Sequence, residues 1–342
     1  MPSTKIVDAL RQAIIEEMDA DPSVVLLGED IAVFNGSYRV TEGLLDRYGA
    51  ARVCDTPISE SAIAGAAIGA AMTGLRPIAE IQFNDFMTCA MDQICNQAAK
   101  IRLMMGGQVS VPVVFRAPYG ATGRAAQHSQ SLEAWFAHVP GLKVVMPSTP
   151  YDAKGLLKTA IRDDNPVIFL EHKLLYGASS PGGKAKTAVD DLDTTFKPAP
   201  DEPYFIEFGV ADIKRAGQHV TIVATGLMVH KAVKAAKVLA QRGLECEIID
   251  PRTIVPLDFA TILKSVQKTG RLVIVTESVA NCGVAAEIAA CMSEQGILSL
   301  KAPVRRVCAK HSPMPFAPAC EADVLPGEQD IIAAVSEICR DI

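Results

Sequence analysis

Short apolar runs rich in β-branched residues alternate with longer helical patterns along this chain, and this alternation restricts the possible folds more than any other feature. Four runs in the first half are apolar almost throughout, as expected of strands buried on both faces: Val24–Gly28, Val111–Arg116, Lys143–Met146 and Val167–Leu170. Helical patterns separate them. This order predicts an α/β protein in which helices cover a parallel sheet.

The chain has 342 residues, more than one hydrophobic core usually supports, so two domains are expected. The segment 177–203 interrupts the alternation, because it is rich in Gly, Pro and charged residues and has no sustained apolar period. A second α/β series follows, with strands expected at 219–225, 246–250, 272–276 and 304–307 and helices near 227–241, 256–268, 283–295 and 328–340. We therefore expect a first domain at 1–180, a linker at 181–204 and a second domain at 205–342.

Two helices of the first half can be located from their patterns. Apolar residues recur at three- and four-residue steps from Asp85 to Met105, and the glycine pair at 106–107 ends the pattern. Asn84 or Asp85 would cap the start of this helix. Thr149 and Pro150 supply an N-cap and a first-turn proline for a helix over 151–162.

Composition excludes several classes of protein. The 33 basic and 39 acidic residues give a net charge of −6, and no basic cluster suggests a nucleic-acid partner. The nine cysteines are odd in number and form no C-x-x-C, so we expect free, buried thiols rather than disulfides or a thiolate zinc site. The N-terminus carries acidic residues where a signal peptide needs an apolar run, and no stretch is long enough to span a bilayer. A soluble cytoplasmic protein without a membrane partner is expected.

Several catalytic motifs are missing from the sequence. The first expected strand is followed by GEDIAVFNG rather than by G-x-G-x-x-G, and neither a P-loop, a G-x-S-x-G nor an H-E-x-x-H occurs. These absences argue against NAD-dependent hydride transfer, NTP hydrolysis, α/β-hydrolase chemistry and zinc-dependent proteolysis.

A carboxylate at the start of a small-residue helix is the first candidate for chemistry. Glu60 lies in DTPISESAIAGAAIGAAMTG, residues 55–74, whose alanines and glycines would let another helix approach closely. Glu60 could simply be a carboxylate stabilised by a helix N-terminus. Alternatively, a tightly packed subunit or cofactor junction would desolvate Glu60 and raise its pKa for proton transfer.

Two further candidates lie in loops that follow expected strands. His128, in GATGRAAQHSQS, is a candidate acid or base because ligands bind beyond the carboxyl ends of parallel strands, although a structural histidine is equally consistent with the pattern. Phe86, in FNDF, could stack on a flat ligand or belong to the core. His138, His172 and His311 are weaker candidates.

Together, these segments resemble the beta subunit of the thiamine-diphosphate-dependent first component of 2-oxo acid dehydrogenase complexes, of the pyruvate or acetoin dehydrogenase type. The resemblance runs nearly end to end and includes LLGED, DTPISE, GAAMTGLRPIAE, FNDF, RAPYGATGRAAQHSQS, HVPGLKVVMPSTPYDAKGLL and HSPMPF. It implies a transketolase-like pyrimidine-binding domain with a parallel sheet, followed by a transketolase C-terminal-like α/β domain. It also implies an oxidoreductase that decarboxylates pyruvate or cleaves acetoin and transfers the acyl unit to a lipoyl group.

The resemblance assigns roles to four residues. Glu60 would hydrogen-bond the aminopyrimidine ring of thiamine diphosphate and so favour the tautomer that acts as an internal base. Phe86 would lie against that ring, His128 would face the substrate and the lipoyl group, and Glu29 would lie toward the cofactor. The resemblance also implies a structural potassium ion, bound by oxygen atoms of Val113, Ala160, Ile161, Asp163 and Asn165.

The family's diphosphate half-site uses G-D-G to hold Mg²⁺, and this chain contains no G-D-G. The resemblance therefore implies an alpha subunit that holds the diphosphate and Mg²⁺, in an alpha-two beta-two heterotetramer, and an acyltransferase core as a further partner. Branched 2-oxo acids as substrates, or a non-catalytic scaffold subunit, remain alternatives. In the second domain Asp250 and Glu277 end strands, and structural roles suit both at least as well as catalytic ones.

Overall fold

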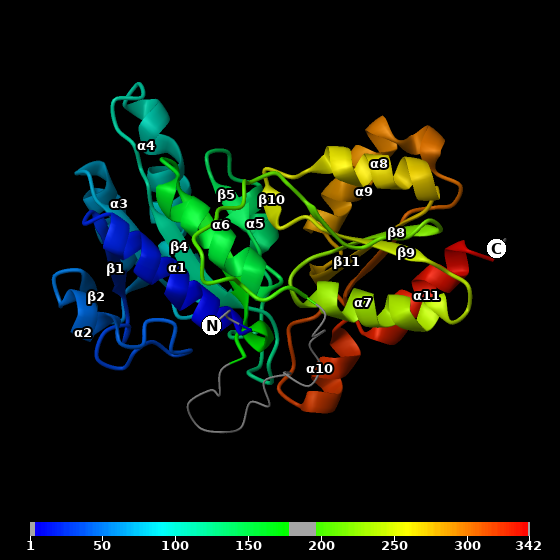
Figure 1. Ribbon diagram of the computed structural model, residues 1–342, viewed down its shortest axis with the longest axis horizontal. Helices are drawn as coiled ribbons and strands as arrows, with labels where there is room; N and C mark the ends of the chain where they lie inside the picture. The colour runs from blue at the N-terminus through cyan, green and yellow to red at the C-terminus, as the bar shows by residue number, and fades with distance from the viewer. Residues whose placement is uncertain (1–3, 178–195, 341–342) are drawn as a thin grey trace.

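Two sheets organise the protein, a computed structural model of which describes residues 4–177 and 196–340 (Figure 1). The seven-stranded sheet has the order β10-β5-β6-β4-β3-β1-β2 and the five-stranded sheet the order β12-β11-β8-β9-β7. The strands of the first sheet that come from the first half are all parallel: β1 Val24–Gly28, β2 Val53–Asp55, β3 Arg76–Glu80, β4 Val114–Tyr119, β5 Lys143–Val145 and β6 Val167–His172. The α/β class predicted from the alternation is confirmed.

The second sheet repeats this pattern with one exception. It contains β7 Asp212–Arg215, β8 Val220–Ala224, β9 Cys246–Asp250, β11 Leu272–Val279 and β12 Arg305–Ala309, of which β7 runs antiparallel to β9. The short strand β10, Thr253–Val255, leaves this sheet and pairs antiparallel with β5 at the edge of the first one. The second half of the chain thus contributes a strand to the first sheet. The expected linker at 181–204 lies largely outside the described residues.

Helices cover both sheets. The first half forms α1 Ile6–Ala20, α2 Leu44–Tyr48, α3 Glu60–Met72, α4 Ala99–Met104, α5 Glu133–Ala137 and α6 Pro150–Arg162. The second half forms α7 Leu227–Ala240, α8 Phe259–Thr269, α9 Val284–Gln295, α10 Pro318–Val324 and α11 Glu328–Ile338. Helix α6 begins as predicted, because the Thr149 hydroxyl accepts a hydrogen bond from the Asp152 amide and Pro150 occupies the first turn.

The buried core is continuous between the two halves. One cluster joins residues of α1 and α6 with residues of α7 and α11, which lie on one face of the two sheets. A second cluster joins α3 and α5 with α8 and α9 on the other face. The two sheets are therefore held together by apolar packing as well as by β10.

The prediction of a single helix from Asp85 to Met105 is wrong. The segment forms a 3₁₀ helix at Asn84–Ala90, a π-helix at Asp92–Ala98 and then α4. Three- and four-residue spacing of apolar residues is compatible with all three helix types, so it identified the buried side without fixing the hydrogen-bond repeat. Irregular helices of this kind often occur at functional sites.

Cysteine burial also differs from the expectation. All nine cysteines are free, as expected, but only Cys246 and Cys339 are buried, whereas Cys89, Cys282 and Cys320 are exposed. The remaining four are partly buried, and two of these, Cys95 and Cys308, pack against the edge of the core. Within the described residues, no helix is both long and apolar enough to cross a bilayer.

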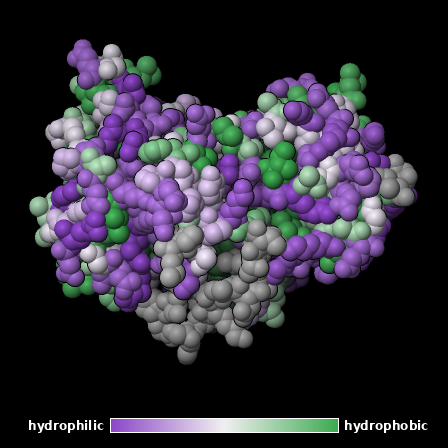
Figure 2. Space-filling model, in the orientation of Figure 1, coloured by the Kyte–Doolittle hydropathy of each residue, from purple (hydrophilic) through white to green (hydrophobic). Residues whose placement is uncertain are grey.

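Figure 2, drawn in the orientation of Figure 1, shows a mostly hydrophilic surface with small hydrophobic groups among the polar ones. Figure 2 also shows that this face is hollowed between the two halves.

Candidate active site

Four neighbouring strands of the first sheet deliver the four predicted site residues. In the sheet these strands lie in the order β4-β3-β1-β2. The segments after their carboxyl ends carry, in the same order, His128, Phe86, Glu29 and Glu60. Because carboxyl ends of parallel strands meet at one edge of a sheet, residues far apart in the sequence converge there. This edge is the candidate active site.

An aromatic cluster brings His128 and Phe86 into contact. The ring centroids of Phe83, Phe86 and His128 are 5.2–5.4 Å apart, and all three pairs meet edge to face. Phe83 is buried, whereas Phe86 and His128 are only partly covered. The partly covered pair can therefore contact a bound molecule while Phe83 supports it from below.

Two carboxylates lie on the other side of the site. Glu60 is the first residue of α3, where the helix dipole favours a negative charge, and its side chain is half-buried. Glu29 follows β1, and burial, with the carboxylates of Asp30 and Glu60 nearby, raises its pKa. Burial and the two nearby carboxylates therefore favour the protonated form of Glu29.

The exposed face of α3 extends away from Glu60. Ala62, Ala66 and Gly69 are exposed on this helix, while Ala64, Ala67 and Ile68 face the core. The exposed stripe consists of small residues, which allow another backbone to approach closely. This exposed face beside Glu60 is therefore suited to the predicted junction with another subunit or a cofactor.

Side-chain hydrogen bonds hold the segment after β1 in place. The Gln82 amide donates to the Glu29 carbonyl at 3.0 Å, and the Ser37 hydroxyl donates to the Gln82 side-chain oxygen at 2.5 Å. The Asp55 carboxylate accepts hydrogen bonds from the amides of Ala32 and Val33. Asp55 at the end of β2 and Gln82 after β3 thereby position the loop that carries Glu29.

Asn84 and Asp85 position the loop that carries His128. The N-cap of the 3₁₀ helix is Phe83, so the predicted capping role of Asn84 or Asp85 is wrong. Instead the Asn84 amide donates to the Gln130 carbonyl at 2.9 Å and its side-chain oxygen accepts from the Leu132 amide at 3.2 Å. The Asp85 carboxylate accepts hydrogen bonds from both the backbone and the side chain of Gln130. Both polar groups are buried, so these partners satisfy them.

Lys173 is a residue of this site that the sequence did not indicate. It follows β6, is almost fully buried and donates a hydrogen bond to the His128 carbonyl. Its ammonium group lies 4.9 Å from the centre of the Phe83 ring. Burial lowers the pKa of Lys173 to about 8, although the carboxylates of Asp85 and Glu277 oppose this change.

A buried ionic network lies in the sheet below the site. The Arg116 guanidinium, 1% exposed, forms two hydrogen bonds of 2.7 Å with Glu171 and one of 2.7 Å with Glu80. Tyr176 donates a third hydrogen bond to Glu171 and stacks on Tyr38 at 4.6 Å. The network connects β3, β4 and β6, three strands that lie side by side in the sheet.

The predicted potassium ligands lie around the end of α6 and the start of β4. The Val113 carbonyl accepts a hydrogen bond from the Val167 amide, and the Ala160 carbonyl accepts one from the amide of Asp163. The Ile161 carbonyl accepts a hydrogen bond of 3.1 Å from Arg76. Each carbonyl keeps a second lone pair, so the three oxygens remain able to bind a cation.

Asp163 and Asn165 complete this oxygen set. Asp163 accepts two hydrogen bonds of 2.9 Å from Asn165 and pairs with Lys143, and Asn165 accepts one of 2.7 Å from Arg102. Burial would raise the pKa of Asp163, but the hydrogen bonds from Lys143 and Asn165 lower it below its ordinary value, so the carboxylate is ionised at neutral pH. An oxygen-only set with an ionised carboxylate fits a hard cation, although the Lys143 ammonium competes for Asp163.

Comparisons with known proteins agree with this architecture. Residues 3–179 match the transketolase pyrimidine-binding domain and residues 209–331 the transketolase C-terminal domain. The chain is 50% identical to the beta subunit of acetoin:2,6-dichlorophenolindophenol oxidoreductase of Cupriavidus necator, over 97% of this chain and 96% of that protein. It is 48% identical to the pyruvate dehydrogenase E1 beta subunit of Rickettsia felis, over 97% of each chain, and 47% identical to that of Rhizobium meliloti, over 99% of this chain and 70% of that protein.

The chain belongs to the pyruvate and acetoin dehydrogenase beta-subunit family. The resemblance stated from the sequence and the expected oxidoreductase subunit are thereby confirmed. A solved structure titled split gene transketolase, inactive beta4 tetramer, covers 99% of both chains with a TM-score of 0.79 at 22% identity. That similarity confirms the two-domain transketolase-like fold.

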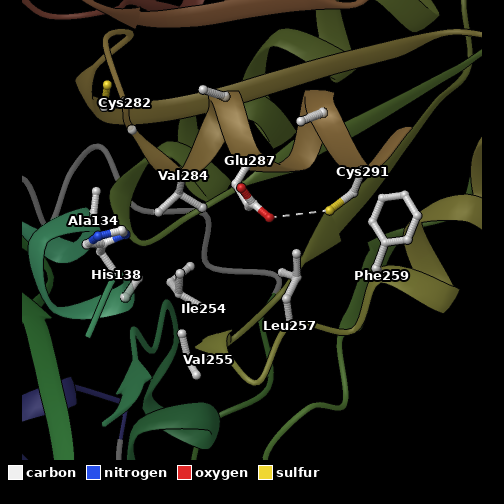
Figure 3. Close-up of a pocket in the computed structure, with 14 residues that line it drawn as sticks. Ala134, His138, Ile254, Val255, Leu257, Phe259, Cys282, Val284, Glu287 and Cys291 are labelled. Carbon is white, nitrogen blue, oxygen red and sulfur yellow. Dashed lines mark hydrogen bonds between the residues drawn. The ribbon is translucent and has the colours of Figure 1, made fainter. Parts of the chain in front are cut away.

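A separate pocket of about 760 Å³ lies between α5, the residues around β10 and α9. Figure 3 shows His138 approaching it from α5, and Glu287 and Cys291 pointing into it from α9, with a 3.6 Å hydrogen bond between them. Its remaining lining is largely apolar and includes Ile254 and Leu257. None of the residues that line it is among Glu29, Glu60, Phe86 and His128, so this pocket is not part of the candidate active site.

Proposed function

We propose that this chain is the beta subunit of a thiamine-diphosphate-dependent dehydrogenase component that decarboxylates pyruvate or cleaves acetoin. The single observation that carries the proposal is the convergence of His128, Phe86, Glu29 and Glu60 after four adjacent parallel strands. Family membership supports it independently, because relatives about half identical over nearly the whole chain are named for acetoin and pyruvate. The named relatives do not favour branched 2-oxo acids.

The roles of the residues follow from their surroundings. When bound, thiamine diphosphate supplies the electron sink for cleavage of the carbon–carbon bond. Glu60 would hydrogen-bond the distant nitrogen of the aminopyrimidine ring, as the family resemblance implies, and Glu29 lies close enough for the two carboxylates to interact. Phe86 would contact the face of that ring. His128 would transfer protons at the substrate and at the acyl-accepting sulfur of a lipoyl group.

We propose an alpha subunit as the obligate partner, in an alpha-two beta-two assembly that works with a lipoyl-bearing acyltransferase core. The sequence has no G-D-G with which to hold Mg²⁺ and the diphosphate, so the partner would supply both. The exposed small-residue face of α3 beside Glu60 is suited to close packing of such a partner. The division into domains at 1–180 and 205–342, a cytoplasmic location and a structural potassium ion at Val113, Ala160, Ile161, Asp163 and Asn165 belong to the same proposal.

The choice between pyruvate and acetoin depends on a pocket shared with the partner. The segments AAQHSQ, HSPMPF and FNDF favour acetoin, whereas FNGSYRVTEGL is more typical of pyruvate dehydrogenase. The deciding experiment copurifies this chain with its alpha subunit and follows reduction of an artificial electron acceptor with thiamine diphosphate and Mg²⁺. Pyruvate and acetoin are compared side by side, and the preferred substrate identifies the branch.

A Glu60→Gln variant tests the catalytic proposal against a non-catalytic scaffold. Glutamine keeps the size of the side chain but cannot share a proton with the ring nitrogen, so we expect turnover to fall roughly 100-fold or more. Glu294→Gln, which changes an exposed carboxylate on α9, is the matched control and should retain full activity. Undiminished turnover by Glu60→Gln would favour the scaffold.

A further inference from the structure

The loop that carries His128 is held from the second half of the chain at two points. This loop, residues 120–132, connects β4 with α5. The Ala121 amide donates a hydrogen bond of 2.7 Å to Glu277, a residue of β11. The Gly123 amide donates to both carboxylate oxygens of Glu321, at 3.0 and 2.8 Å, and Glu321 lies on α10. Two carboxylates from the C-terminal domain therefore bind backbone amides of a loop in the pyrimidine-binding domain.

Glu277 is itself held rigidly. It is buried, and its second carboxylate oxygen lies 2.7 Å from Nε2 of His172, the last residue of β6. Because Nδ1 of His172 accepts a hydrogen bond from the Leu174 amide, its Nε2 carries the proton and donates to Glu277. The carboxylate thus joins β11, β6 and the start of the loop, and a hydrogen bond to a charged group is stronger than one between neutral groups.

The loop fits closely against this pair. Gly120 has a φ of +92°, and a Cβ at this position would meet Nε2 of His172 at 2.2 Å and a Glu277 oxygen at 3.0 Å. Gly123, which binds Glu321, also has a positive φ of +72°. Gly120 precedes the Ala121 amide that binds Glu277, whereas Gly123 binds Glu321 through its own amide, and both adopt backbone conformations that favour glycine.

The far end of the loop is held by the first domain. The Gly120 amide donates to the Gln130 carbonyl at 3.1 Å, which closes the loop, and Asp85 binds Gln130. Lys173 binds the His128 carbonyl itself. His128 therefore lies on a segment fixed at both ends, with its amino-terminal end fixed by the C-terminal domain. A displacement of a proton-transfer group by about 1 Å can reduce the rate about 100-fold.

We propose that Glu277 and Glu321 are positioning residues for His128, so that the C-terminal domain sets the geometry of the active-site loop. This inference rests on the proposed function, in which His128 transfers protons. Neither carboxylate contacts the reacting atoms; each acts through the backbone of residues 120–124. The sequence indicated no catalytic role for the C-terminal domain, because carboxylates 156 and 198 residues away from their partners leave no local pattern.

The first arm of the test measures the loop directly, without reference to activity. Hydrogen–deuterium exchange of peptides that cover residues 120–130 is compared in the full wild-type chain, Glu321→Ala and Asp323→Ala. Asp323 lies on the same helix but pairs with Lys310, and both side chains are more than half exposed. We expect exchange about tenfold faster in Glu321→Ala, as for loss of a hydrogen bond to a charged group, and no change in Asp323→Ala. Unchanged exchange in Glu321→Ala would overturn the proposal.

The second arm measures turnover in the complex with the alpha subunit. Glu321→Ala should lower kcat roughly 10- to 100-fold with little change in KM, and Glu321→Gln should recover part of the loss because its amide oxygen still accepts one hydrogen bond. In a His128→Gln background, Glu321→Ala should cause no further loss, since both changes remove the same function. Multiplicative losses would refute positioning through His128. If the wild-type complex were inactive, the proposed function would fail while the exchange arm still decided whether Glu321 holds the loop.

Discussion

Replacement of Arg116 by methionine should expose the energetic role of the ionic network below the active site. The guanidinium is 1% exposed and neutralises two carboxylates that are themselves almost fully buried, Glu80 and Glu171. Arg116→Met keeps the apolar stem but leaves both carboxylates without their cation. Removing one partner of a buried ion pair costs about 3–5 kcal/mol, which corresponds to a fall in Tm of roughly 6–20 °C for a domain of this size.

The pH dependence of this loss separates electrostatics from packing. Burial raises the pKa of Glu80, and Arg116 opposes this change, so the variant should raise that pKa further. A carboxyl group whose folded pKa exceeds its unfolded value stabilises the fold fully below the unfolded pKa and loses this contribution as the pH rises through the folded pKa. The loss of unfolding free energy in Arg116→Met relative to wild type should therefore be smallest near pH 5 and grow toward pH 8.

Urea unfolding of wild type and variant at several pH values measures both quantities. Arg47→Met is the matched control, because Arg47 and its partner Asp19 are both about half exposed. This variant should lose no more than about 1 kcal/mol of unfolding free energy. A deficit below 1 kcal/mol for Arg116→Met would refute the argument from uncompensated buried charge. A large deficit that did not vary with pH would assign the effect to packing instead.

Two further predictions concern the active-site loop and the cation site. In urea unfolding, Gly120→Ala should destabilise the protein by clearly more than Gly43→Ala. Both glycines have a positive φ, which alone costs an alanine roughly 1–2 kcal/mol, but a Cβ at position 120 would meet His172 at 2.2 Å, whereas a Cβ at position 43 would meet nothing within 4 Å. Equal losses of unfolding free energy in the two variants would contradict the steric argument. When K⁺ replaces Na⁺ in the buffer, the Tm of the wild type should rise, but the Tm of Asp163→Ala should not. The stabilisation of the wild type should be about 2.7 kcal/mol when the K⁺ concentration is 100-fold above its Kd. Equal shifts in both proteins would count against a site at Asp163.

Local patterns predicted much of the fold correctly. Continuous apolar runs predicted β1, β4, β5 and β6 but not β2 and β3, the other two parallel strands that the first half contributes to the first sheet. Thr149 with Pro150 predicted the start of α6, because helix capping depends on residues close together in the sequence. The same reasoning failed for the segment from Asp85 to Met105, where hydrogen bonds to a loop 45 residues away accompany an irregular helix. It also missed β10, whose partner β5 lies more than 100 residues earlier.

The candidate site was likewise predictable from the sequence only in part. The sequence by itself determined the family, and it proposed Glu29, Glu60, Phe86 and His128 as site residues because each lies in a segment that resembles that family. Only the tertiary structure brought these segments to one edge of the sheet, since strand order is set by long-range pairing. It alone revealed Lys173, Glu277 and Glu321 around the His128 loop, because polar groups that bind backbone amides across a domain boundary need no fixed spacing in the chain.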